Sequence, residues 1–181
     1  GMTDLVFGQP DNGIIQLGFL VPDLERAMAE WTLRLGAGPW FVLEAFAGVD
    51  PRYRGEETRS RADIALGFAG HMQIELIRPC DDLPSVYQSM IQRGAYGFHH
   101  FGLATRAFEQ DLAARTQGGD EVVFTAAVPG GGRVAHLETS TPMPGLIELI
   151  DVNDAIEQMF DDMYQASVDW DGSEPVRRLG G

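Results

Sequence analysis

Two short apolar stretches of this chain contain the same four residues, Ile-Glu-Leu-Ile, and each places one carboxylate in a strand-like setting. The two acids, Glu75 and Glu148, lie 73 residues apart. Because an unpaired carboxylate is costly to bury, each acid needs a partner of opposite charge. Two further polar residues, Gln16 and His100, stand in earlier apolar strands. An amide oxygen, an imidazole and two carboxylates together suit a divalent cation such as Zn²⁺, Ni²⁺, Mn²⁺ or Fe²⁺.

Strand alternation decides whether these four side chains can meet. Successive side chains of a strand point to opposite faces, so Gln16 and His100 should face away from the helix layer, whereas Ile15 and His99 should face toward it. If the first and last strands of each unit are neighbours, the four polar groups converge. The alternatives are a hydrogen-bonded core histidine and simple ion pairs between each acid and an arginine, with three candidates: Arg78, Arg93 and Arg133.

The elements that must position these groups occur in the same order twice. The first series is strand 14–21, helix 24–36, strand 38–46, a polar loop 47–61, and strands 62–69 and 71–78. The second series begins at strand 98–105, where His100 aligns with Gln16 from 84 residues earlier. Such a repeat predicts two β-α-β-β-β modules. The predicted division is a first module at 14–79, a linker at 80–96, a second module at 97–152, and a C-terminal helix and tail at 153–181.

Composition excludes several classes of function. The formal net charge of −14 disfavours nucleic acid and anionic membrane surfaces as partners. All 13 cationic residues are arginine, which rules out Schiff-base lysines and P-loops. No apolar run is long enough to span a membrane. The single Cys80 excludes an internal disulfide, and with no secretory signal visible at the start we expect a cytoplasmic protein.

Four segments together resemble the vicinal oxygen chelate superfamily: IIQLGFLVPDLERAMAEW, HMQIELIRP, GFHHFGLAT and GLIELIDV. This superfamily includes glyoxalase I, methylmalonyl-CoA epimerase, extradiol dioxygenases and bleomycin-resistance proteins, and the chain is most similar to the glyoxalase-like members. The resemblance implies an α+β fold in which the two modules form a partly open, eight-stranded barrel-like sheet. It also implies that the metal positions fall on Gln16, Glu75, His100 and Glu148.

The same resemblance implies a reaction. A glyoxalase-like metalloenzyme would transfer a proton alpha to a carbonyl through an enediolate, as a lyase or an isomerase. Glu148 would be the base, and Glu75 its partner across the metal. Two alternatives stay open: an extradiol-type dioxygenase, which would need His at the Gln16 position, and a non-catalytic small-molecule binder of the same fold. The epimerase branch more often has His at the first metal position and Gln at the second.

Substrate contacts are predicted from side chains near the same faces. His71 and Gln73 share the face of Glu75, and His136 lies in the strand before Glu148. Arg52 and Arg54, in the polar loop, would suit the phosphate or carboxylate of a CoA or glutathione substrate. The alternatives are a solvated rim and a solvated charged loop. We expect a small-molecule substrate and a homodimer; the sequence leaves open whether the site closes within one chain or across two.

Overall fold

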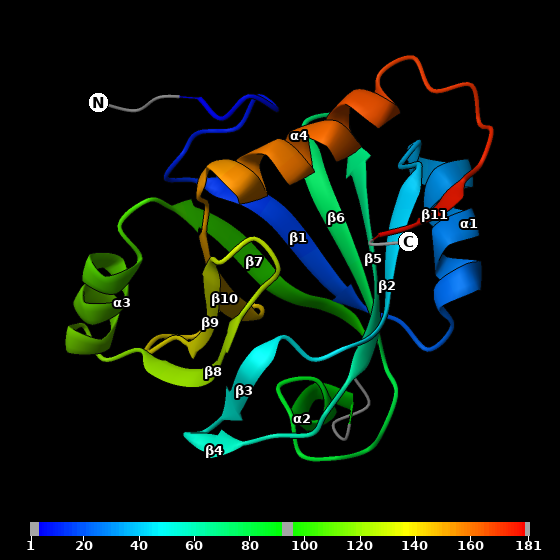
Figure 1. Cartoon of the computed structure of the whole chain (residues 1–181). Coiled ribbons are helices and arrows are strands. Elements are labelled where there is room, and N and C mark those ends of the chain that lie inside the picture. Colours follow the sequence, from blue (N-terminus) through cyan, green and yellow to red (C-terminus); the bar gives the residue numbers. More distant parts are fainter. Residues whose placement is uncertain (1–3, 92–95, 180–181) are drawn as a thin grey trace.

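The computed structural model describes residues 4–91 and 96–179 of the chain, drawn in Figure 1. Within these residues, all strands belong to one mixed sheet in the order β11-β2-β5-β6-β1-β7-β10-β9-β8-β3-β4. The strands are β1 Ile14–Leu20, β2 Trp40–Phe46, β3 Val49–Tyr53, β4 Glu56–Glu57, β5 Ala62–Ala69, β6 Met72–Pro79, β7 Gly97–Thr105, β8 Glu121–Ala127, β9 Arg133–Glu138, β10 Leu146–Asp151 and β11 Val176–Arg178. The helices are α1 Leu24–Leu35, α2 Gln88–Ile91, α3 Phe108–Gln117 and α4 Asp154–Ser167.

Two halves of the sheet meet at its centre. β1 pairs in parallel with β6, β7 pairs in parallel with β10, and an antiparallel β1–β7 pair joins the halves. The sheet is strongly curved and does not close (Figure 1). The predicted α+β fold with a partly open, barrel-like sheet is therefore confirmed. The strands beyond the expected eight are β3, β4 and β11.

Helices α1 and α3 pack against the sheet from outside the barrel. Asp23 caps α1 by accepting a hydrogen bond from the Arg26 backbone N–H, and Gly36 ends the helix in the left-handed conformation. Met28 then packs with Trp40 in the core beneath α1. In α3, Phe108 is buried in a smaller cluster against the other half. None of the helices in the described residues is long and apolar enough to cross a membrane.

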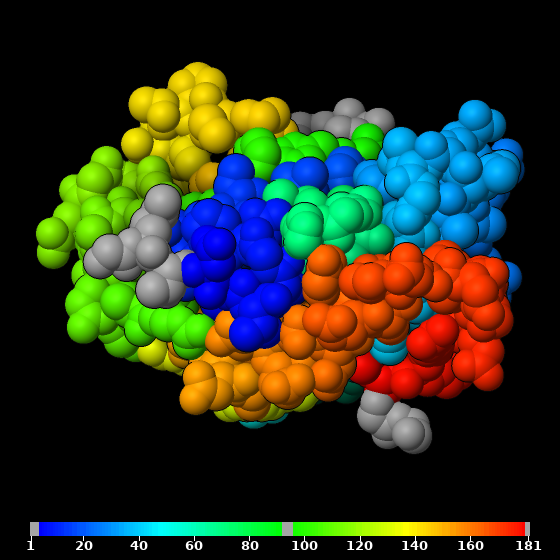
Figure 2. All heavy atoms as spheres, turned by 90° about the horizontal axis from the view of Figure 1, so that it is seen from above, coloured from blue at the N-terminus to red at the C-terminus, as the bar shows by residue number. Residues whose placement is uncertain are grey.

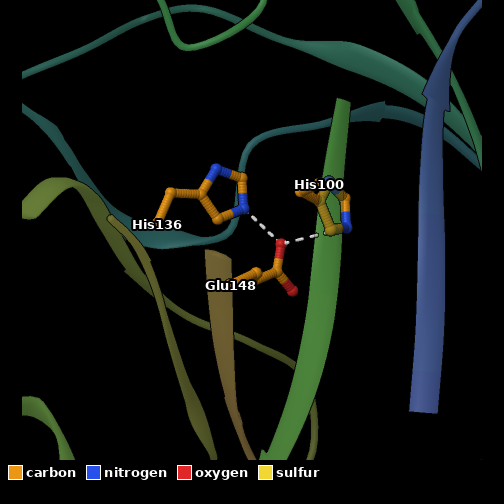
Figure 3. Close-up of side chains that lie close together, drawn as sticks. All are labelled: His100, His136 and Glu148. Carbon is orange, nitrogen blue, oxygen red and sulfur yellow. Dashed lines mark hydrogen bonds and ion pairs between the residues drawn. The ribbon is translucent and has the colours of Figure 1, made fainter. Parts of the chain in front are cut away.

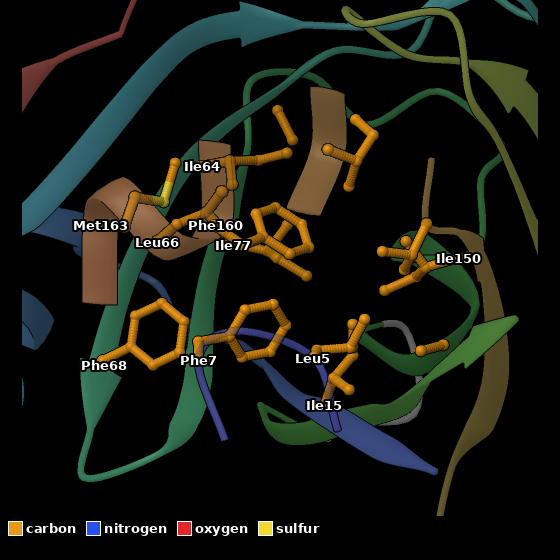
Figure 4. Close-up of a cluster of buried hydrophobic side chains, with 14 of the residues drawn as sticks. Leu5, Phe7, Ile15, Ile64, Leu66, Phe68, Ile77, Ile150, Phe160 and Met163 are labelled. Carbon is orange, nitrogen blue, oxygen red and sulfur yellow. The ribbon is translucent and has the colours of Figure 1, made fainter. Parts of the chain in front are cut away.

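Helix α4 fills one end of the barrel. Its buried side chains Ile156, Phe160 and Met163 join the largest apolar cluster, shown in Figure 4. The N-terminal segment packs beside α4, with the ring of Phe7 against that of Phe160. Figure 2 shows the two segments side by side at this end of the molecule. The predicted C-terminal helix is thus present, and it covers this end of the barrel.

Two segments predicted to be loops form strands instead. Residues 47–61 contain β3 and β4, and β3 pairs with β8 of the other half. The C-terminal tail contains β11, which pairs with β2. Both are polar or short strands near sheet edges, where one face is solvated and the apolar pattern that marks a buried strand is absent.

Two β-bulges interrupt the alternation in the central β1–β7 pair. Ile14 pairs with Leu103 and Gln16 with Gly102, so Ile15 is an extra residue. Gly18 pairs with His100 while the next residue pairs with Phe98, so His99 is likewise extra. A bulge turns its residue out of the regular pattern. The prediction that Ile15 and His99 face the helix layer is therefore wrong: Ile15 joins the same cluster as α4, and His99 lies against His100.

Candidate metal centre

Two rows of polar side chains cross the middle of the sheet. In the first row, strand register places Gln73 beside Gln16, Gln16 beside Gly102, Gly102 beside Glu148, and Glu148 beside His136. This register fixes which side chains meet, because directly paired residues on adjacent strands have their Cβ atoms close together.

The second row places Gly18 between Glu75 and His100. A Cβ at Gly18 would overlap the imidazole of His100, and a Cβ at Gly102 would lie 2.7 Å from Cβ of Gln16. Each glycine therefore leaves room for a side chain of the neighbouring strand to lie across it. With glycine at both crossings, the two rows come together into one cluster.

The four predicted metal ligands converge on Nε2 of His100. This atom lies 2.8 Å from Oε1 of Gln16, 3.4 Å from Oε1 of Glu75 and 3.7 Å from Oε1 of Glu148. The His100 side chain is fully buried, while those of Glu75 and Glu148 are 14% and 10% exposed. The structure thus brings together all four residues, from both halves of a single chain. Their metal-binding role stays a prediction.

A chain of hydrogen bonds sets the tautomer of His100. Nε2 of His99 lies 3.0 Å from the Val86 carbonyl oxygen, which only accepts, so Nε2 of His99 must donate. Burial lowers the pKa of His99 to about 3, with His136 adding to the shift, so the ring is neutral. Nδ1 of His99 therefore accepts from Nδ1 of His100, 2.8 Å away. Burial, with His99 and His136 nearby, also lowers the pKa of His100.

It follows that Nε2 of His100 presents a lone pair to three oxygen acceptors. The Gln16 amide does not donate a hydrogen bond to this lone pair, because its Nε2 donates to Oε1 of Gln73 at 2.8 Å. Burial and the nearby Glu148 carboxylate raise the pKa of Glu75, so a cation between the two acids would favour the ionised form of Glu75. A divalent cation with bonds of about 2.0–2.2 Å would separate adjacent ligand atoms by about 3.0–3.5 Å. The donor set therefore suits such a cation, and the distance from His100 Nε2 to Glu75 Oε1 lies within this range.

His136 is a fifth member of the cluster. Its Nε2 contacts Oε1 of Glu148, and ligand atoms of His100, His136 and Glu148 all lie within 4.8 Å of one another (Figure 3). Within the described residues, Nδ1 of His136 is buried and lacks a hydrogen-bond partner. The sequence predicted His136 as a substrate contact, and the structure places it beside the proposed base.

A cavity of about 370 Å³ opens in front of the cluster. Gln16, Glu75, His136 and Glu148 line its polar side. Tyr87, from the segment before α2, lies near both acids, and its pKa is raised chiefly by burial and further by the two carboxylates. The opposite wall comes mainly from α4, β2, β3 and β8.

Two predicted substrate residues, one directly before β6 and one within it, lie outside this cavity lining. His71 is exposed at the start of the strand, where its Nδ1 lies 2.9 Å from the Phe7 carbonyl oxygen and its ring stacks on Tyr164. Gln73 is fully buried and serves as the hydrogen-bond partner of Gln16. Its supported role is to orient the Gln16 amide.

The predicted arginines also lie elsewhere. Arg52 pairs with Asp50 and Glu57, and Arg54 pairs with Glu121 and Glu138. Tyr53, between them, lines the cavity instead. Strand alternation within β3 would have shown this, but the polar composition of the segment predicted a loop.

Among the described residues, neither candidate arginine forms an ion pair with Glu75 or Glu148. Arg78 pairs with Asp63, and Arg133 pairs with Glu109. Arg93 lies outside the described residues. Two polar lining residues that the sequence did not predict, Ser60 and Tyr87, reach the cavity through packing between distant segments, and no local pattern marks them.

Comparison with known proteins identifies the family. The family model of the Glyoxalase/Bleomycin resistance protein/Dioxygenase superfamily matches residues 15–136. The chain belongs to this superfamily. The match spans β1 to His136, so it includes both central parallel strands of the first half and the first three strands of the second. No curated protein matches the chain.

Solved structures share the fold at low sequence identity. A hypothetical protein from Bacillus halodurans C-125 superposes with a TM-score of 0.60 at 18% identity, covering 79% of this chain and 96% of that chain. The methylmalonyl-CoA epimerase from Mycobacterium tuberculosis gives 0.58 at 19% identity, covering 76% and 86%. A Streptomyces coelicolor methylmalonyl-CoA epimerase in complex with 2-nitronate-propionyl-CoA gives 0.53 at 18% identity, covering 77% and 96%. Identities this low show the fold alone.

Proposed function

We propose that this chain is a metal-dependent enzyme that transfers a proton at a carbon next to a carbonyl group. The observation that carries the proposal is the lone pair of His100 Nε2 facing three oxygen acceptors, from Gln16, Glu75 and Glu148, within 3.7 Å. These four residues would hold the cation. When bound, a divalent cation polarises a carbonyl oxygen and lowers the pKa of the neighbouring C–H group.

The residues of the chain supply the remaining chemistry. Glu148 would accept the proton, with Oε1 held by His136 and Oε2 left to face the substrate. Glu75 approaches His100 from the other half of the sheet, so a second carboxylate is placed to return a proton from a different direction. The cavity beside both acids would position the substrate and exclude water. This arrangement supports an isomerase or a lyase.

Proton exchange tests the proposal directly. The full chain would be loaded in turn with Zn²⁺, Ni²⁺, Mn²⁺ and Fe²⁺, and exchange of the α-protons of 2-hydroxyacetophenone with D₂O would be followed by NMR. We expect exchange that requires metal and falls by at least about 100-fold in Glu148→Gln, the usual scale of a lost general base. The matched control is Glu138→Gln, which changes an exposed acid paired with Arg54. Undiminished exchange in Glu148→Gln would remove Glu148 from the mechanism.

The assembly and the compartment remain part of the proposal. We propose a homodimer, although the cluster is complete within one chain, so dimerisation would not be needed to form the site. The exposed thiol of Cys80 supports a reducing, cytoplasmic setting. Sedimentation analysis of the full chain tests the assembly.

A further inference from the structure

Apart from the acids and a few hydroxyl groups, the cavity is lined mainly by apolar side chains. Five aromatic rings line the cavity: Phe46, Tyr53, Tyr87, Phe124 and Phe160. Aliphatic side chains from both halves and from α4 fill the gaps between them, including Leu43, Ile64, Leu66, Ile150 and Met159. Such a wall stabilises a ligand by removing its apolar surface from water, at about 25 cal/mol per Å².

The described part of the cavity lining contains no cationic side chain for an anionic ligand. Among the described residues that line it, none is an arginine, and the chain contains no lysine. Arg52 and Arg54 form ion pairs with carboxylates outside the cavity lining, and the side chain of Arg59 is exposed. Glu75 and Glu148 stand on the polar side, and one divalent cation would only balance them. A phosphate or carboxylate on the ligand would therefore be desolvated without a partner, which is costly.

Size gives a second restriction. At about 370 Å³ the cavity is near the lower end of the roughly 300–1,000 Å³ typical of small-molecule pockets. The hydroxyl of Ser60 belongs to the lining, and its Oγ is one of the buried side-chain atoms that lack a hydrogen-bond partner in the described residues. This hydroxyl could satisfy one neutral polar group of a bound molecule, because buried polar atoms normally have a partner.

We propose that the substrate is a compact, uncharged, mainly hydrocarbon molecule with its carbonyl group at one end. The carbonyl oxygen would meet the cluster around His100, and the hydrocarbon part would contact the aromatic and aliphatic side chains of the lining. CoA thioesters and glutathione conjugates, with their long charged arms, would be rejected. This inference rests on the proposed function, because the carbonyl oxygen of the substrate would bind the cation held by the cluster around His100.

Calorimetry on the zinc-loaded full chain tests the ligand class. The neutral probes are 2-hydroxyacetophenone and benzoin, and the anionic probes are propionyl-CoA and S-lactoylglutathione. We expect at least one neutral probe to bind at least tenfold more tightly than either anionic probe. Met159→Ala, which shortens an apolar side chain of the wall, should weaken the neutral probe by about tenfold. The control Leu33→Ala, at a side chain 79% exposed on α1, should leave binding unchanged.

Two outcomes overturn the inference. One is binding of either anionic probe as tight as that of the neutral probes. The other is no binding of the neutral probes to protein shown by elemental analysis to hold zinc. Proton exchange is measured separately, so its absence in a protein that still prefers the neutral probes would count against the proposed reaction and leave the ligand class standing. Failure to hold metal would count against the proposed function itself.

Discussion

The two halves of the sheet have the same backbone arrangement but contribute different chemistry. In the first half Gly18 pairs with Glu75, and in the second half Gly102 pairs with Glu148. The bulges also correspond: Ile15 and His99 are the extra residues, each directly before a polar side chain that points into the cluster. The backbone thus provides each half with one acid, one glycine crossing and one bulge.

The side chains at these matched positions differ in kind. The first half has Ile15 and Gln16 where the second has His99 and His100. Leu66 pairs with Glu75, whereas His136 pairs with Glu148. All three imidazoles of the cluster therefore come from the second half, and the first half supplies an amide and an apolar wall. The repeated backbone determines which positions lie side by side. Because the side chains at those positions differ, only the second half places an imidazole, that of His136, beside the proposed base Glu148.

The largest difference between the halves should appear when the two first-strand ligands are removed in turn. We expect His100→Ala to weaken zinc binding by more than about 100-fold, above the range seen for residues that only support a ligand. Gln16→Ala should weaken it by only about tenfold, because a neutral amide is the weaker donor. Competition with a fluorescent chelator measures both. Equal losses would mean that the halves hold the cation equally.

The glycine crossings give the next largest effect. Alanine at Gly18 would overlap the His100 ring, which is held at Nδ1 by His99, so the ring must move and zinc binding should weaken, by less than in His100→Ala. Alanine at Gly102 meets Gln16 instead. Both variants should lower the free energy of unfolding by about 1–3 kcal/mol, as overpacking usually does.

Denaturant unfolding measures the loss of stability in both variants, and chelator competition measures their loss of zinc affinity. Gly18→Ala should lose more zinc affinity than Gly102→Ala at a similar loss of stability. The reverse ranking would contradict the idea that the second half dominates the site.

Much of this arrangement is predictable from the sequence, for physical reasons. The duplicated Ile-Glu-Leu-Ile and the two-residue period of strands sufficed to predict the convergence of Gln16, Glu75, His100 and Glu148. The module boundaries stay a prediction, which the matching registers of the two halves support.

The rest could not be predicted because it depends on departures from local rules. A bulge changes the face of a residue without changing composition, so alternation placed Ile15 and His99 wrongly. The partner of His99 is the Val86 carbonyl, a backbone group in a segment that sequence reasoning treated as a linker. The pairing of β3 with β8 joins segments far apart in the chain, and it set Tyr53 in the cavity while Arg52 and Arg54 met other acids.

Replacing His99 by the residue of the first half should have an intermediate effect. His99→Ile removes the acceptor that holds Nδ1–H of His100, so the ring can turn or change tautomer. Loss of such a supporting hydrogen bond typically costs about 10–100-fold in metal affinity. His99→Gln, which restores a side-chain acceptor, should recover part of this loss.

The matched control is Ile15→Val at the equivalent bulge. It should cost about 0.5–1.5 kcal/mol of stability and leave zinc affinity unchanged. If His99→Gln bound zinc no better than His99→Ile, the role of His99 would be packing alone.

The smallest effect is expected at His136, whose counterpart is Leu66. His136→Leu removes the contact with Glu148 but also removes a buried Nδ1 that has no partner in the described residues. The lost hydrogen bond to a charged group is worth about 1.5–3 kcal/mol, and the unsatisfied atom costs about 1–3 kcal/mol. Because Glu148 is then buried without this partner, the loss outweighs the removal of the unsatisfied Nδ1, and the metal-free protein should unfold at a lower denaturant concentration than the wild type.

Zinc affinity and proton exchange should respond differently to this variant. We expect zinc binding to weaken by about tenfold, the lower end of the range for a residue that supports a ligand, while exchange falls further because Glu148 loses the group that orients it. If His136→Leu lost as much zinc affinity as His100→Ala, His136 would itself be a metal ligand. The second half would then supply one more ligand than proposed.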